Sequence, residues 1–214
     1  MPTAKTASWL AAATALVFLL LLAVVHLHGI AQQYFELVHH PATYTEEIIE
    51  HSRELNIIFV LDNIFIILYT SMALFSIKTW SGNAPSFVAY LSGGLIIAVA
   101  ILDFWENFHI YSLMQQAKGG IVVEAASITW QSTESMMKWH LAYFAFFMLG
   151  FLVPARTALE RMLKYSLWFL FLPTGVLVYA TVGSSYEMLF QWIRFINLLA
   201  GFVLIFFIMR RMRE

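Results

Sequence analysis

The stretch Leu102-Asp103-Phe104-Trp105-Glu106-Asn107-Phe108-His109 closes an apolar run that is long enough to span a membrane. Two carboxylates, an amide and an imidazole therefore fall at or just under the edge of the hydrocarbon core. Lipid cannot solvate such groups, so other parts of the protein must do so. This stretch predicts an all-α integral membrane bundle that encloses a layer of polar side chains.

The composition agrees with the membrane class. Hydrophobic residues make up 61% of the 214 residues and charged residues 12%, whereas soluble domains carry about 25% charged residues. A chain this poor in charge cannot cover itself with a polar surface, so the lipid bilayer is its expected partner and nucleic acid is not. The chain contains no cysteine, which excludes disulfides and thiolate metal sites.

Apolar runs predict six transmembrane helices in a single polytopic domain of residues 1–214. The first run has no cleavage site and exceeds the apolar length of a signal peptide, so we interpret it as an uncleaved span. The expected spans are residues 9–30, 55–77, 86–109, 136–153, 166–183 and 187–209.

Short helical connections are expected on the outer side of the bundle. Thr43 followed by Glu46 forms a capping-box pattern that predicts a helix over residues 43–54. Residues 110–135 are expected to form a hairpin, hinged at Gly119-Gly120, that closes over the bundle. Within the fifth predicted span, Pro173 removes a backbone donor and predicts a kink.

The distribution of basic residues orients the bundle. They gather on one side of the predicted topology, at Lys5, Lys78, Arg156, Arg161, Lys164 and the tail Arg210, Arg211 and Arg213. The positive-inside rule then places both termini in the cytoplasm, an N-in/C-in topology. No loop contains an N-x-S/T sequence, which is compatible with a bacterial inner membrane.

Polar residues of different spans fall at a similar depth in the outer half of the membrane. At about 1.5 Å per residue, Asp62 and Arg194 lie roughly 10 Å inside and Asp103 roughly 9 Å. We predict a polar pocket open to the outer face, with candidate catalytic residues Asp62, Asp103, Glu106 and Arg194 as its floor. Its candidate ligand-binding residues are Asn63, Asn107, Lys138 and Asn197, and His109 and His140 line the same wall.

A divalent metal is an alternative occupant of this layer. Its candidate ligands are His26, His109 and His140 together with Asp103 and Glu106. Three such ligands and a water would form a Lewis-acid centre, although no HExxH or HxxxH spacing is present. Haem held by His26 and His140 is a less favoured cofactor, and Glu47 with His51 is interpreted as a solvated helix face.

Three functions are compatible with this pattern. The first is a membrane-embedded enzyme or ligand-binding protein for a lipid-like molecule, favoured because a pocket in one leaflet needs no path through the membrane. The second is a small-solute or proton-coupled transporter, which Pro173 and Gly175 favour as signs of a broken helix. The third is a structural network in which Asp62, Asp103 and Glu106 pair with Lys138 and Arg194. The substrate and oligomeric state are left open.

Overall fold

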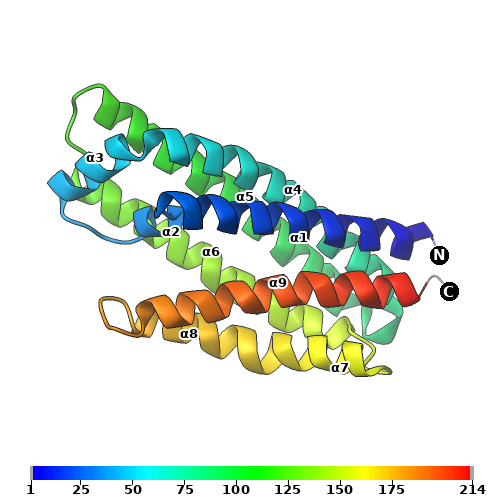
Figure 1. Cartoon of the computed structure of the whole chain (residues 1–214). Coiled ribbons are helices and arrows are strands. Elements are labelled where there is room, and N and C mark those ends of the chain that lie inside the picture. The colour runs from blue at the N-terminus through cyan, green and yellow to red at the C-terminus, as the bar shows by residue number, and fades with distance from the viewer. Residues whose placement is uncertain (1, 213–214) are drawn as a thin grey trace. The chain divides into compact units, whose positions relative to one another are not determined.

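A computed structural model describes residues 2–212, and the regular elements in this range are helices (Figure 1). The long helices are α1 (Pro2–His28), α4 (Ser52–Trp80), α5 (Ser86–Lys118), α6 (Ala125–Leu152) and α9 (Glu187–Arg211). The shorter ones are α2 (Gln32–Phe35), α3 (Pro41–Glu50), a 3-10 turn (Ser81–Asn83), α7 (Ala158–Tyr165), a π-helical turn (Ser166–Leu170) and α8 (Phe171–Ala180).

Five segments of the described chain are long and apolar enough to cross a membrane. They are Thr3–His28, Ser52–Asn83, Ser86–Lys118, Ala158–Ala180 and Met188–Arg211. These five segments support the predicted all-α membrane class, but they do not confirm the predicted number of six transmembrane helices. The expected fourth span lies in α6, which is not among the five, and the first half of α6 carries the polar residues Gln131, Glu134, Ser135 and Lys138.

The expected hairpin over residues 110–135 is instead built mainly from two long helices. α5 continues to Lys118 and α6 begins at Ala125, so a short connection replaces the lid. The continuation of α5 has a physical reason, because Ile110, Leu113, Met114 and Ala117 form a buried stripe at helical spacing. Gly120 then adopts a left-handed backbone, with φ of 81°, at the turn between the helices.

The chain divides into two compact units, which are described separately. Unit 1 consists of Met1–Leu16, Ile67–Val99 and Trp139–Glu214, and unit 2 of Val17–Ile66 and Ala100–Lys138. Helices α1, α4, α5 and α6 therefore each contribute one part to each unit.

The short helices α2 and α3 complete the core of unit 2. Phe35 of α2 packs edge-on against Tyr44 of α3 with ring centroids 5.4 Å apart, and both side chains are fully buried. Thr45 Oγ1 accepts the backbone N–H of Val123 at 3.0 Å, which ties α3 to the connection before α6. The helix expected over residues 43–54 is thus α3 together with the start of α4, with a break at His51.

Unit 1 contains the irregular helical segment of the chain. The π-helical turn lies between α7 and α8 and contains Phe169. Pro173 in α8 has no backbone N–H, so it cannot donate a hydrogen bond to the carbonyl of Phe169. Gly175 of α8 permits close packing, because a Cβ at this position would clash with the ring of Tyr143. In the same unit, Ser8 of α1 donates to the carbonyl of Phe206 in α9 at 3.4 Å.

Candidate functional site

A single ammonium group lies among buried carboxylates in unit 2. The Nζ atom of Lys138 in α6 lies 2.9 Å from Asp103 Oδ1 and 3.7 Å from Glu36 Oε1, and it also contacts Glu106 Oε2. Lys138 is 5% exposed and Glu106 is fully buried. Helices α5 and α6 and the residue that follows α2 therefore meet at one cation inside the unit.

The amide of Asn107 extends this cluster to α4. Its Nδ2 donates to Asp62 Oδ2 at 2.7 Å and to Asn63 Oδ1 at 3.1 Å, and its Oδ1 accepts from Gln32 Nε2 at 2.6 Å. Asn107 is 3% exposed, so these bonds replace water in satisfying the amide. They also fix the orientation of the amide, because the donor and acceptor sides face different partners.

Glu106 has a protein partner on each carboxylate oxygen. Ser135 Oγ donates to Oε1, and the ammonium of Lys138 contacts Oε2. Gln131, one turn earlier on α6, donates to Ser135 Oγ at 3.0 Å. The polar stripe of α6 thus holds Glu106 in place.

The charges of this cluster do not balance. Glu36, Asp62, Asp103 and Glu106 are four carboxylates, and Lys138 is the cation that the ion pairs of unit 2 place among them. A buried carboxylate without a counter-ion is expensive in hydrocarbon. The cluster must therefore hold protons or accept a further cation.

A second polar contact joins α5 and α6 nearby. His109 Nδ1 lies 2.7 Å from Glu134 Oε2, and Trp105 Nε1 donates to Glu134 Oε1 at 3.0 Å. Both oxygens of Glu134 therefore have partners. The imidazole of His109, a candidate metal ligand, uses one of its two ring nitrogens in this pair.

A groove of about 400 Å³ opens between α4 and α5 in unit 2. Its lining combines aromatic rings with amides, namely Asn56, Phe59, Val60, Asn63, Phe104, Asn107, Phe108 and Tyr111. Asn63 and Asn107 belong both to this lining and to the hydrogen-bonded cluster, so one amide separates the groove from Asp62. Phe108 on its wall is 67% exposed, which leaves the groove accessible from outside.

The remaining predicted site residues lie elsewhere. Arg194, Asn197 and His140 belong to unit 1, where Asn197 Oδ1 accepts from Ser166 at 2.5 Å and His140 stacks on Tyr179 at 5.2 Å. A shared floor of Arg194 with Asp62, Asp103 and Glu106 stays a prediction. His26, a candidate metal and haem ligand, is exposed in unit 2.

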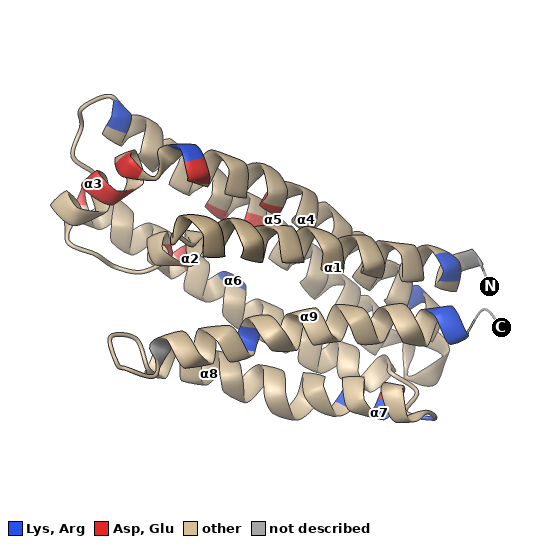
Figure 2. Cartoon of the chain, viewed as in Figure 1, with Lys and Arg blue, Asp and Glu red and all other residues tan. Residues whose placement is uncertain are grey.

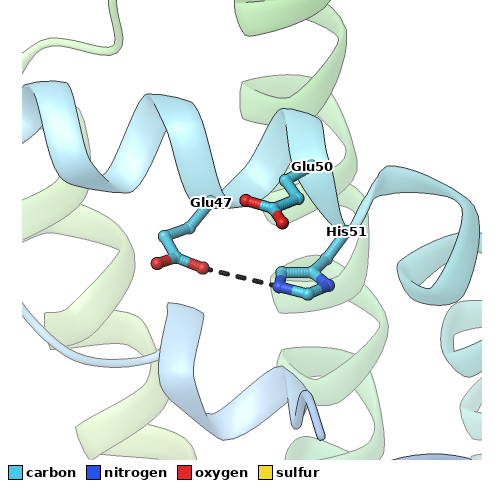
Figure 3. A group of neighbouring side chains, drawn as sticks. All are labelled: Glu47, Glu50 and His51. Atoms are coloured by element: carbon cyan, nitrogen blue, oxygen red, sulfur yellow. Dashed lines mark ion pairs between the residues drawn. The ribbon is translucent and has the colours of Figure 1, made fainter. Parts of the chain in front are cut away.

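One group of side chains in the described chain has the spacing of a metal site. Glu47, Glu50 and His51 each offer a ligand atom, and these atoms lie within 4.8 Å of one another (Figure 3). Glu47 Oε2 lies 3.5 Å from His51 Nε2, and the trio lies at the end of α3 with Glu50 exposed. The solvated helix face expected for Glu47 and His51 stays a prediction.

Several members of the cluster were missed by the sequence reasoning. Gln131 and Ser135 were missed, although they precede the predicted residue Lys138 at intervals of four and three residues, a helical spacing that indicates one shared face. Gln32 and Glu36 are likewise one turn apart, in the connection between the first two predicted spans. These two spacings, together with Glu134 on the same turn of α6, were the features of the sequence from which these cluster residues could have been identified.

No family model, curated protein or solved structure matches the chain. The class of the protein therefore follows from its fold and site alone. It is an all-helical protein with the features of a membrane protein, and it buries an acidic cluster around one lysine beside an aromatic groove.

Proposed function

We propose that this protein is a membrane-embedded ligand-binding protein or enzyme for an amphiphilic, lipid-like molecule. The groove of unit 2 carries the proposal, because its walls are aromatic and its floor offers the amides of Asn63 and Asn107. Small-molecule sites usually occupy about 300–1,000 Å³ and combine apolar walls with a few convergent polar groups. A volume of about 400 Å³ falls within this range.

The amide floor would position the polar part of such a ligand. The Nδ2 group of Asn107 donates hydrogen bonds to Asp62 and Asn63. A ligand group that contacts this amide would therefore lie next to a carboxylate network. Asp62, Asp103 and Glu106 are the candidate proton donors and acceptors of this network. The apolar part of the ligand would lie along Phe59, Phe104 and Phe108.

We also propose that α6 is a sixth span and that both termini are cytoplasmic. The second half of α6, residues 141–152, carries no charged residue, and the contacts of Lys138 shield the polar half from lipid. The hydrogen bond between Ser8 and the carbonyl of Phe206 supports an even number of spans. The basic segments would then face the cytoplasm of a bacterial inner membrane.

A photo-crosslinking experiment tests the groove. Purified protein is incubated in detergent with a substoichiometric photoactivatable phospholipid, and the crosslinked peptides are mapped by mass spectrometry. Crosslinks should concentrate on residues 56–63 and 104–111. Phe108→Ala should lower their yield, whereas Phe87→Ala should not, because Phe87 lies on the same helix with a similar exposure of 64% but outside the groove.

Even labelling along all apolar helices would contradict a specific site. Turnover is tested separately with Asp103→Asn, which neutralises one carboxylate without changing its size. In an enzyme, this variant should lose turnover of the crosslinked lipid class and keep the crosslinks in the groove. If a folded Asp103→Asn variant loses both the turnover and the crosslinks, Asp103 maintains the structure of the site and has no separate role in the reaction.

Proton-coupled transport is the second candidate, and the charge imbalance of the cluster favours it. Chains of acidic residues inside membranes serve as proton relays, and the π-helical turn before Pro173 gives unit 1 a broken helix. Flux across proteoliposomes under a proton gradient distinguishes the two functions. If Asp103→Asn abolishes flux of a small solute, transport replaces the enzymatic proposal.

A further inference from the structure

Arg194 is a buried cation of unit 1. Its residue is 3% exposed, and it lies within Met188–Arg211, one of the segments that can span a membrane. Its Nε has no hydrogen-bond partner, and no ion pair of the described residues includes its guanidinium. A buried charge with no counter-ion is strongly destabilising, so this guanidinium requires an anion.

Unit 1 has little means of supplying that anion from its own chain. Ten of the thirteen acidic residues belong to unit 2, and the acidic positions of unit 1 are Glu160, Glu187 and Glu214. Figure 2 shows this scarcity of acidic residues along α8 and α9. Glu160 is engaged at the start of α7, where it accepts the backbone N–H groups of Arg156 at 2.8 Å and Thr157 at 2.7 Å. The side chains of Glu187 and Glu214 are outside the described part of the chain.

Aromatic rings hold the guanidinium in a defined place. Its carbon lies 3.9 Å from the ring centroid of Trp139 and 5.2 Å from that of Phe195. Trp139 in turn stacks on Tyr143 at 6.0 Å, and Gly175 allows Tyr143 to approach α8 closely. The Trp139 ring under Arg194 is therefore itself packed against a second aromatic ring.

This stacking determines what the guanidinium can still bind. Contact with a ring occupies the flat face of the group and stabilises its charge without neutralising it. The N–H donors point outward in the plane of the guanidinium, where they match two oxygens of a carboxylate or phosphate. Nε, the donor without a partner, belongs to this edge.

We infer that Arg194 and its aromatic platform form an anion-binding site for a phosphate or carboxylate group. All of its residues belong to unit 1. Two sources offer the same chemistry, namely the headgroup of an anionic lipid and a free anion in water. The location of Arg194 in an apolar helix is compatible with a lipid, and the experiment separates the two sources.

Binding is measured on delipidated wild-type protein by native mass spectrometry and by thermal shift. Phosphatidylglycerol, phosphatidylcholine, inorganic phosphate and acetate are compared at equal ionic strength. We expect one anion per chain and a thermal shift with phosphatidylglycerol or with phosphate, and none with phosphatidylcholine. A response to phosphatidylglycerol alone identifies a lipid headgroup, and an equal response to phosphate or acetate identifies a free anion.

Variants test whether Arg194 carries this binding. Arg194→Gln should weaken it at least about tenfold, because hydrogen bonds between charged groups are lost. The anion affinity of Arg194→Lys should lie between those of wild type and Arg194→Gln, since lysine keeps the positive charge but lacks the planar guanidinium. Arg161→Gln is the matched control, because Arg161 is an exposed arginine of the same unit.

Two results would overturn the inference. One is a wild-type protein that binds none of the three anions, namely phosphatidylglycerol, phosphate and acetate, and the other is Arg194→Gln binding them as tightly as wild type. If Arg194→Gln does not fold, Trp139→Leu keeps the charge and removes the platform, and it should also weaken binding. Unchanged affinity in a folded Trp139→Leu variant would contradict the site as described.

Discussion

Replacing Lys138 by methionine tests whether one cation holds the acidic cluster together. Methionine keeps an unbranched chain of similar size and removes the ammonium, so the change is mainly one of charge. It leaves Glu36, Asp103 and Glu106 without the group that contacts all three. Removing one partner of a buried ion pair costs about 3–5 kcal/mol. We expect the upper end of this range, because several carboxylates share the same cation.

The expected loss is large enough to measure by thermal denaturation in detergent. For a chain of this size, 1 kcal/mol corresponds to about 2–4 °C in Tm, so Lys138→Met should melt at least about 10 °C lower than wild type. Lys118→Met is the matched control, since Lys118 is exposed at the end of α5. The variant should regain part of its stability at acidic pH, where protonation removes the uncompensated charge.

A second substitution separates charge from packing. Glu106→Gln keeps an acceptor for Ser135 while removing one negative charge, so the double variant with Lys138→Met should melt higher than Lys138→Met alone. A Lys138→Met variant within about 3 °C of wild type, which is about 1 kcal/mol, would refute the central role of this cation. A double variant that melts lower than the single one would refute the charge argument.

The remaining predictions concern stability in detergent, measured as Tm. Gly175→Ala adds a Cβ that clashes with Tyr143 and should cost about 1–3 kcal/mol, whereas Gly201→Ala, with nothing within 4 Å of the new Cβ, should gain up to about 1 kcal/mol. Thr157→Ala removes the acceptor of the capping box of α7 and should cost about 1 kcal/mol. Burial raises the pKa of the Tyr44 phenol above its ordinary 10.0, and the Glu106 carboxylate raises it further. The fold therefore holds the neutral phenol, so its contribution to stability is complete below pH 10 and is lost as the pH rises above 10.

Each of these predictions has a contrary outcome. Equal Tm values for Gly175→Ala and Gly201→Ala would contradict the close packing of Gly175 against Tyr143. A Tm of Thr157→Ala equal to that of wild type would show that the cap of α7 is dispensable. The Tyr44 prediction is checked with Tyr44→Phe between pH 8 and 11.5. This variant should lack the alkaline loss and should melt near wild type at pH 7, since the hydroxyl of Tyr44 has no partner among the described residues.

Depth and helical face were readable from the sequence because both depend on position along one helix. The spacing of Asp103, Glu106 and Asn107 places them on one helical face, and all three belong to the same cluster in the structure. Asp62 was placed at a similar depth, and Asn107 contacts it. The all-α membrane class followed from the apolar runs in the same way.

Contacts between distant segments could not be derived from such patterns. Gln32 begins α2, a helix of four residues that is too short for a periodic pattern, and Glu36 directly follows this helix. Gly29, with φ of 69°, turns the chain before α2. The apolar runs place residues 125–135 of α6 in the expected hairpin over residues 110–135, outside the predicted fourth span. The polar side chains of α6 face partners on α5 and directly after α2, and only the fold reveals those partners.

The order of residues in the acidic cluster has a consequence for biogenesis. Glu36, Asp62, Asp103 and Glu106 all precede Lys138 in the chain, so the ribosome releases the carboxylates before their cation. α4 and α5 are therefore made with acidic groups before α6 supplies the lysine that the ion pairs of the described residues place among them. Each uncompensated charge at the centre of a helix adds at least about 2.5 kcal/mol to insertion. Unit 2 thus acquires its stability late in synthesis, when α6 arrives and closes the cluster.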